Sequence, residues 1–182
     1  MTCLKKCIVT AVLVMLPASA YAQGRVPHTD SAAIGGDVGI FLPRDASLTS
    51  GPVLEGFYEY YLSPRLSVRT GLGWANPAYD REHADKLRHF RVAIDAVRNW
   101  EGGAVHPFVG AGLGVYFLQA KDNGENSGDS ESKLGGTIFG GAEFFANSTT
   151  SVKAEARYHM IKNVGPLNPD GLALTVGLKK YF

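Results

Sequence analysis

The residues of this chain that could do chemistry are its histidines and its carboxylates. None of the 5 histidines has a second histidine at the spacing with which one strand or helix presents two ligands to a metal ion. Acidic and basic side chains recur together, and the ones singled out are Glu59, Arg69, Arg91, Asp95, Glu143, Lys153, Glu155 and Arg157. Two carboxylates can act as general acid and base when their surroundings separate their pKa values, but carboxylates beside Arg and Lys are held as ion pairs. We therefore expect no catalytic site, no metal ion and no cofactor.

The most polar segment, residues 121–133, offers one further candidate. Asp122, Glu125, Asp129 and Glu131 could supply oxygen ligands for calcium, but their spacing departs from that of an EF-hand loop. A solvated charge cluster in a mobile loop is the expected structure.

The first residues have the pattern of a secretory signal peptide. Lys5 and Lys6 precede a short apolar run, and small residues end it at Ala22. The run is far shorter than the roughly 20 residues that span a bilayer as a helix. We expect cleavage after Ala22, which divides the chain into a signal peptide, residues 1–22, and one domain, residues 23–182.

The composition of the expected mature domain excludes several functions. Both cysteines, Cys3 and Cys7, lie in the expected signal peptide, which leaves no disulfide and no thiolate site. Without Lys5 and Lys6, 16 of the 18 basic residues remain against 17 acidic residues, a net charge of −1. A domain without a basic excess lacks the electrostatic footprint of nucleic-acid binding.

Eight segments alternate apolar with polar or small residues, the period of a β-strand with two different faces. The segments are residues 33–42, 53–62, 66–74, 88–98, 109–117, 136–145, 150–160 and 172–182. A membrane-spanning strand needs only about 9 to 11 residues that are apolar on one face. The pattern predicts an all-β protein, an eight-stranded antiparallel up-and-down transmembrane β-barrel.

The predicted connections alternate in length. Four are long, residues 43–52, 75–87, 121–133 and 161–171, whereas residues 63–65 and 146–149 are tight turns and 99–104 is intermediate. Outer-membrane barrels have short periplasmic turns and longer outward loops. We expect the long loops to face outward, with residues 76–86 and 121–133 available to a surface ligand.

An internal repeat relates two of the predicted hairpins. Residues 58–74 match residues 142–158 at a constant offset of 84, which aligns Glu59 with Glu143 and Trp74 with Tyr158. Duplication of a hairpin and convergence on the barrel alternation both explain this match.

The charged residues decide which face of each strand points inward. An unpaired Arg or Lys near the bilayer midplane costs roughly 2 to 4 kcal/mol on the lipid side of a barrel. The eight charged residues named at the outset should therefore point into the lumen. Since eight strands leave only enough room for side chains, they should fill the lumen as an ion-pair network, with glycines such as Gly71, Gly73 and Gly112 making room.

Three segments resemble a known family. Residues 107–114, residues 155–159 and the close of the chain, residues 176–182, are similar to the small outer-membrane β-barrel domain family of OmpA/OmpX-like and opacity-like surface proteins. The resemblance implies an outer-membrane location, contact with outer-membrane lipid and lipopolysaccharide, and insertion by the barrel-assembly machinery. The implied C-terminal assembly signal is Leu174, Val176, Leu178 and Phe182. Lys180 departs from the family pattern, which has an apolar or aromatic residue there.

The functional expectation is a non-enzymatic barrel with a structural or surface-interaction role. A small porin-like permeation barrel is the alternative. His159 and residues 168–171 also resemble the C-terminal region of outer-membrane lipid A deacylases, but the serine expected just after the histidine is absent, since Met160, Ile161 and Lys162 follow it. A lipid-modifying hydrolase is therefore disfavoured, and we expect His159 to be a hydrogen-bonding residue at the rim of the lumen.

Overall fold

The computed structural model describes residues 27–79, 86–100, 105–122, 125–126, 130–162 and 168–182. Its eight long strands are β1 (Ala32–Pro43), β3 (Gly51–Ser63), β4 (Leu66–Ala75), β6 (Lys86–Asn99), β7 (Val105–Asp122), β9 (Glu131–Asn147), β10 (Thr150–Ile161) and β11 (Gly171–Tyr181). Each contains one of the predicted segments, apart from Phe182, which lies one residue beyond β11. The predicted all-β class and eight-stranded barrel are thereby confirmed.

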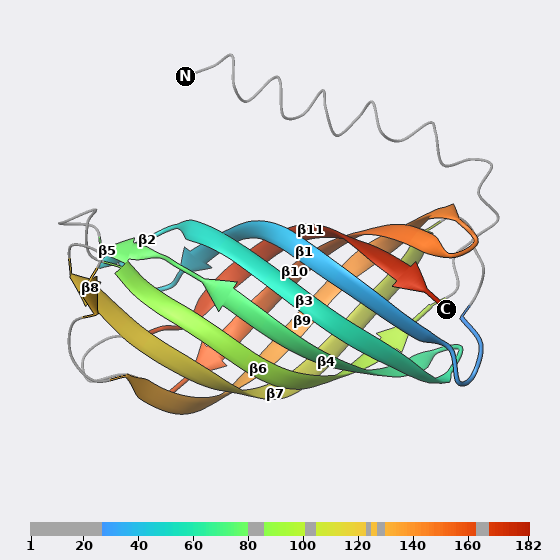
Figure 1. Cartoon of the computed structure of the whole chain (residues 1–182), viewed down its shortest axis with the longest axis horizontal. Helices are drawn as coiled ribbons and strands as arrows, with labels where there is room; N and C mark the ends of the chain where they lie inside the picture. The colour runs from blue at the N-terminus through green and yellow to red at the C-terminus, as the bar shows by residue number, and fades with distance from the viewer. Residues whose placement is uncertain (1–26, 80–85, 101–104, 123–124, 127–129, 163–167) are drawn as a thin grey trace, which may run out of the picture.

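The long strands form a closed antiparallel ring in the order β1, β3, β4, β6, β7, β9, β10, β11 (Figure 1). The ring closes between the first and last strands, with Ala33 opposite Tyr181 and Pro43 opposite Gly171. Beyond the last strand residue, the Phe182 amide donates a hydrogen bond of 3.0 Å to the carbonyl of Ala32. Each of the eight long strands is therefore paired with a long strand on both sides, as a barrel in hydrocarbon requires.

The two ends of the barrel differ. The turns between β3 and β4 and between β9 and β10 lie at one end, here called the turn end, where β11 also finishes (Figure 1). The opposite end, here called the loop end, carries three two-residue strands, β2 (Leu48–Thr49), β5 (Ala78–Tyr79) and β8 (Glu125–Asn126).

The wall extends further into the predicted long loops than we expected. Of residues 121–133, Lys121 and Asp122 belong to β7, two more form β8, and β9 begins at Glu131. The sequence-based boundary was wrong here because backbone pairing, Lys121 opposite Asn126 and Asp122 opposite Glu125, continues where the apolar alternation has stopped.

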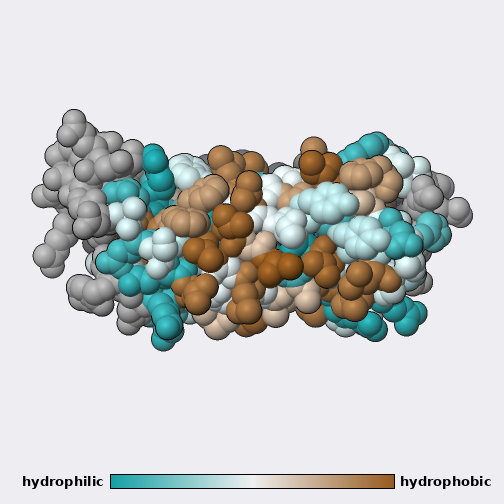
Figure 2. Space-filling view, turned by 60° about the horizontal axis from the view of Figure 1, so that its bottom comes forward, coloured by the Kyte–Doolittle hydropathy of each residue, from teal (hydrophilic) through white to brown (hydrophobic). Residues whose placement is uncertain are grey.

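The alternation of each strand places apolar side chains outside the barrel. On β4, Leu66 and Leu72 are exposed, while Ser67 and Arg69 are buried in the lumen. Figure 2 shows these apolar side chains gathered over the middle of the barrel, with polar residues toward both ends. In the residues that the structure describes, no helix is long and apolar enough to cross a membrane.

Small apolar clusters lie inside the lumen near both ends. Four side chains meet at the turn end: Ala33, Tyr61, Phe145 and Tyr181. A second cluster at the loop end consists of Phe41, Val53, Ala75 and Ala173. Buried charged residues lie between these two clusters.

The two hairpins of the sequence repeat have the same register. In the first, Tyr61 lies opposite Ser67 and Ser63 opposite Leu66, with an irregularity between the two pairs. In the second, Phe145 lies opposite Ser151 and Asn147 opposite Thr150, again with an irregularity there. Every one of these positions is shifted by 84 residues, so the repeat extends from residue types to backbone pairing.

Candidate functional site in the barrel lumen

The eight charged residues predicted to line the lumen are all buried there: Glu59, Arg69, Arg91, Asp95, Glu143, Lys153, Glu155 and Arg157. The structure adds Asp37, Glu55 and Lys179 to this group, and we call the eleven residues the lumen network. Its members come from β1, β3, β4, β6, β9, β10 and β11. The network therefore ties the wall together from inside.

Glu59 lies at the turn-end side of the network. Its carboxylate accepts hydrogen bonds from Ser67 Oγ at 2.5 Å and from Arg69 Nε at 3.0 Å. Lys179 Nζ lies 3.0 Å from the same carboxylate. Both oxygens of this buried acid thus have charged or polar partners, as a buried carboxylate requires.

Glu143 occupies the equivalent place in the second hairpin. It accepts hydrogen bonds from Ser151 Oγ and, at 2.5 Å, from the hydroxyl of Tyr181. Lys179 Nζ donates to it at 3.3 Å and to the Tyr61 hydroxyl at 2.6 Å. Lys179 is consequently shared between the two equivalent glutamates.

Glu155 is the centre of the network. It is contacted by Arg69 Nη1 at 2.8 Å, Lys153 Nζ at 2.9 Å and Arg157 Nε at 2.8 Å. Lys153 also lies 2.7 Å from Asp37. The pair of Arg69 and Glu155 joins β4 to β10, which are fourth neighbours in the ring and so face each other across the lumen.

Arg157 and Arg91 continue the network toward the loop end. Arg157 Nη1 donates to Asp95 at 2.8 Å and to Thr137 Oγ1 at 3.2 Å. Arg91 Nη2 donates to Glu55 Oε1 at 3.1 Å, and Arg157 Nε lies 3.9 Å from the other oxygen of Glu55.

Aromatic rings fill the space around the cations. The guanidinium of Arg157 lies 3.8 Å from the ring centroid of Phe139, and that of Arg69 lies 4.7 Å from Phe57. Lys153 Nζ lies 4.4 Å from the same Phe57 ring. Desolvated cation–π contacts of this kind are worth about 2 kcal/mol each and exclude water from the network.

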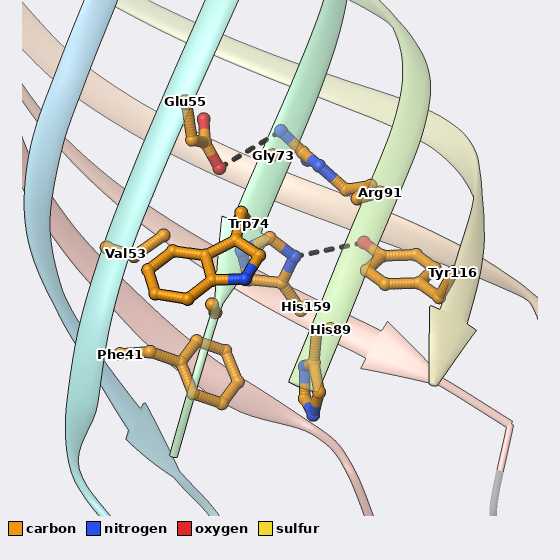
Figure 3. Close-up of a pocket in the computed structure, with 10 residues that line it drawn as sticks. Phe41, Val53, Glu55, Gly73, Trp74, His89, Arg91, Tyr116 and His159 are labelled. Carbon is orange, nitrogen blue, oxygen red and sulfur yellow. Dashed lines mark hydrogen bonds and ion pairs between the residues drawn. The ribbon is translucent and has the colours of Figure 1, made fainter. Parts of the chain in front are cut away.

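A small cavity, here called the loop-end cavity, lies between the pair of Arg91 and Glu55 and the mouth of the barrel (Figure 3). Its volume is about 20 Å³. The lining residues are Phe41, Val53, Glu55, Gly73, Trp74, Ala75, His89, Arg91, Tyr116 and His159. His159 is buried there, and its Nδ1 is 2.9 Å from the Tyr116 hydroxyl. Sequence analysis expected a hydrogen-bonding role for His159 but did not identify its partner or the role of His89.

Comparison with known families decides what kind of barrel this is. The family model described as the outer membrane protein beta-barrel domain matches residues 8–182. The chain belongs to this family. The suspected relationship to small outer-membrane barrels is thus confirmed, and the exposed apolar band of this outer-membrane barrel faces lipid.

Solved structures with the same fold are distant in sequence. Neisserial surface protein A, NspA, has a TM-score of 0.68 and 14% sequence identity, with 84% of this chain and 97% of that chain covered. The N-terminal β-barrel domain of Pseudomonas aeruginosa OprF has a TM-score of 0.60 and 14% identity, with 86% and 100% covered. The outer membrane enzyme PagL has a TM-score of 0.50 and 20% identity, with 81% and 98% covered. No curated protein sequence matches the chain. These likenesses show the fold, which carries more than one activity in outer-membrane barrels.

Three members of the lumen network, Asp37, Glu55 and Lys179, were absent from the predicted set. Their positions in the inward and outward alternation of their strands could have identified them. Leu174, Val176 and Leu178 alternate outward on β11, which points Lys179 inward. Glu55 lies four residues before Glu59 on β3 and so points into the lumen as Glu59 does. Asp37 precedes the exposed Val38 on β1 and so points inward as well.

The predicted assembly-signal residues of this outer-membrane barrel all lie on the lipid-facing side. Leu174, Val176, Leu178 and Phe182 are exposed there, and the Phe182 ring centroid is 6.4 Å from that of Tyr58 on β3. Lys180 shares this face and donates to Thr149 Oγ1 at 2.8 Å at the turn end. Its charge thus reaches the polar rim, as expected for a snorkelling lysine.

Proposed function

We propose that this outer-membrane barrel is a non-enzymatic, non-conducting surface protein whose loop end is its interaction surface. The observation that carries the proposal is the lumen network. Ion pairs between facing walls, above all Arg69 with Glu155, lie across the path that an ion would take. Apolar clusters close the lumen on both sides of these pairs.

The loop end is built as a stable support for an interaction surface. Asp45, between β1 and β2, accepts hydrogen bonds from the amides of Ser47 at 2.9 Å and Asn168 at 3.0 Å. The Arg44 amide donates to the carbonyl of Asp170 at 2.8 Å, and the Asp170 carboxylate accepts from the Ile161 amide at 2.7 Å. These bonds join the two connections on either side of the β1–β11 closure. Rigid supports with variable loops are the usual arrangement for binding surfaces.

The orientation and processing of the chain follow from the same proposal. The loop end faces outward and the turn end faces the periplasm, where both ends of the barrel domain meet. The signal peptide, residues 1–22, lies outside the residues that the structure describes, and cleavage after Ala22 belongs to this proposal. Lipid and lipopolysaccharide cover the apolar band, and the barrel-assembly machinery reads the C-terminal residues.

The surroundings of His159 argue against a hydrolase. Ester hydrolysis by a serine and histidine pair needs a hydroxyl nucleophile beside the imidazole and access to the substrate. His159 instead contacts the phenolic hydroxyl of Tyr116 inside the lumen, away from lipid.

Single-channel recording in planar bilayers tests the proposal against the permeation alternative. The parent barrel should produce no discrete conductance steps, whereas an open porin recorded under the same conditions should. The double variant Arg69→Ser with Glu155→Ser removes the pair that spans the lumen and should begin to conduct. Discrete steps from the parent barrel, equal to those of the double variant, would establish a permeation barrel instead.

A further inference from the structure

The charges on the outer face of the wall are of one sign. Among the described side chains of the eight long strands, Arg88, Arg98 and Lys180 alternate with buried neighbours and so lie on the lipid side. The described carboxylates of these strands all have the alternation of the lumen side. Arg and Lys cost more than Asp and Glu on the lipid face of a barrel, so a face that keeps only cations indicates an anionic neighbour.

Two of these three cations have a partner within the chain at the turn end. Lys180 Nζ donates to Thr149 Oγ1 at 2.8 Å, and the guanidinium of Arg98 lies 5.9 Å from the ring centroid of Trp100. Arg88 lies near the loop end of β6, and its Nε has no hydrogen-bond partner among the described residues. The partner that Arg88 lacks in the described part of the chain has to come from its surroundings.

Aromatic residues lie beside Arg88 on the same face, toward the middle of the barrel. Phe90 follows Arg88 by two residues on β6 and is paired with Phe117 on β7, with ring centroids 6.1 Å apart. Both rings are exposed, and Trp74 on β4 lies opposite Phe90 in the strand register. Aromatic girdles mark the level at which hydrocarbon meets the headgroups. Arg88 is one step nearer the loop end, at the level of the headgroups.

The chemistry of an arginine at this level selects a phosphate group. The aliphatic stem can lie along the wall while the charged head reaches the interface. The planar guanidinium matches the oxygens of a phosphate with two parallel hydrogen bonds. A phosphate monoester, the form found on the sugar headgroup of lipopolysaccharide, carries a charge of about −1.5 to −2 near neutral pH. The diester of a phospholipid carries a single negative charge and is the weaker partner.

We propose that Arg88, Phe90 and Phe117 form a binding site for one phosphorylated glycolipid of the outer leaflet. The guanidinium binds a headgroup phosphate, and the two rings pack against the acyl chains. This inference rests on the proposed outward orientation of the loop end, which places Arg88 in the leaflet that contains lipopolysaccharide. Lipopolysaccharide is then a specific partner of this side of the barrel, bound at β6 and β7, and not only the general surroundings of the apolar band.

Native mass spectrometry of the barrel, refolded in a neutral detergent and titrated with diphosphorylated lipid A, tests the site. We expect the parent to retain one lipid A molecule. Arg88→Leu should weaken binding about tenfold, the loss expected for one charge-assisted hydrogen bond. Arg98→Leu is the matched control, because it removes the same side chain from the same face of β6 at the turn end, and it should match the parent. Removing the phosphates from lipid A should weaken its binding to the parent as much as Arg88→Leu does.

Three results would overturn the proposal. Equal affinity of Arg88→Leu and the parent for lipid A shows that the lipid binds elsewhere. Equal affinity of the parent for lipid A with and without phosphates shows that the rings alone bind it, and this comparison needs no variant. Equal affinity for lipid A and phosphatidylglycerol shows a general site for anionic lipids. Gel mobility of unboiled samples establishes that each variant is folded.

The orientation on which the inference rests is tested separately. Binding in detergent does not depend on which end of the barrel faces outward, so a failed titration overturns the lipid site and leaves the proposed function standing. Labelling of a loop-end tag on intact cells decides the orientation. A tag that is reached only after the outer membrane is permeabilised would overturn both the proposed function and the assignment of the site to lipopolysaccharide.

Discussion

Lys179 and Lys180 are neighbours in sequence that lie on opposite sides of the barrel wall. Lys179 is buried between Glu59 and Glu143, and Lys180 reaches the rim at the turn end. Lys179→Met leaves two buried carboxylates short of a cation, and breaking a buried ion pair in this way costs about 3 to 5 kcal/mol. Lys180→Met should change the free energy of unfolding by less than about 0.5 kcal/mol.

Urea unfolding of the barrel in detergent, followed by the gel mobility of unboiled samples, compares the two lysine variants. The midpoint for Lys179→Met should fall well below that of the parent, while Lys180→Met should match the parent. Equal midpoints for both variants would mean that the lumen network contributes little to stability.

Gly112 is a position where a carboxylate approaches the wall too closely for any side chain. A methyl group there would overlap Asp95 and come 2.6 Å from the carbonyl of Ile94. Gly112→Ala should therefore destabilise the barrel by about 1 to 3 kcal/mol, as overpacking does. Gly56→Ala is the control, because a methyl group there meets nothing within 4 Å. The same urea titration measures both, and a Gly112→Ala barrel as stable as Gly56→Ala would contradict the close approach.

At the scale of the elements, Asp45 couples the connection after β1 to the one before β11. Amide hydrogen bonds from Asn168 and Ser47 favour the charged carboxylate and hold the pKa of Asp45 below its usual value. The stabilisation is fully present above the unfolded pKa of about 3.9 and is lost as the pH falls through the lower folded pKa. Protection of the Asn168 amide against hydrogen exchange should therefore decline only below about pH 4.

The turn between β9 and β10 supplies a control for this pH dependence. The Thr149 amide donates to the side-chain oxygen of Asn147 at 3.0 Å, a similar bond without an ionisable group. Its protection factor should stay constant while that of Asn168 falls, and the two can be followed in one exchange experiment. Parallel declines of both amides would indicate general loosening instead of titration of Asp45.

The last strand carries a prediction about assembly in cells. Phe182 ends the apolar stripe of β11 and pairs with Ala32 at the closure of the ring. Deleting Phe182 should lower the amount of barrel inserted in cells and affect refolding of the purified chain less, because only insertion in cells uses a recognition step. Lys180→Tyr should raise insertion, since it restores the family's aromatic residue. For each variant, heat-modifiable protein in the outer-membrane fraction measures insertion in cells, and the refolding yield of the purified chain is measured beside it. Unchanged insertion after the deletion would refute a recognition role.

The alternation of residue types predicts the elements and the face of each side chain, but not the partners. It predicts an inward direction for Arg69 and Glu155, which are both buried, but it does not predict their contact, because the two residues are 86 positions apart and lie on facing strands. Which charges meet depends on strand tilt and stagger, and alternation does not specify these. The loop-end cavity likewise depends on how the β6 residues His89 and Arg91 are placed relative to His159 on β10.

At the scale of the whole molecule, the orientation of the barrel is open to direct test. The loop end faces outward in the proposed function, so a tag inserted at Gly128, between β8 and β9 in sequence, should be labelled on intact cells. A tag in the turn at Ser148 should be labelled only after the outer membrane is permeabilised. The reverse pattern would invert the barrel and move the interaction surface to the periplasmic side.

The lumen network also makes the two halves of the chain depend on each other. Arg69 with Glu155, Arg157 with Asp95, and Lys179 with Glu59 each join strands β1 to β6 with strands β7 to β11. A sheet that has entered hydrocarbon with only half of its strands would expose these charges to lipid, at roughly 2 to 4 kcal/mol for each unpaired Arg or Lys. Partly built intermediates in a bilayer are therefore less stable than the closed barrel. The bilayer therefore selects for complete barrels, because only a closed barrel keeps these charged side chains away from lipid.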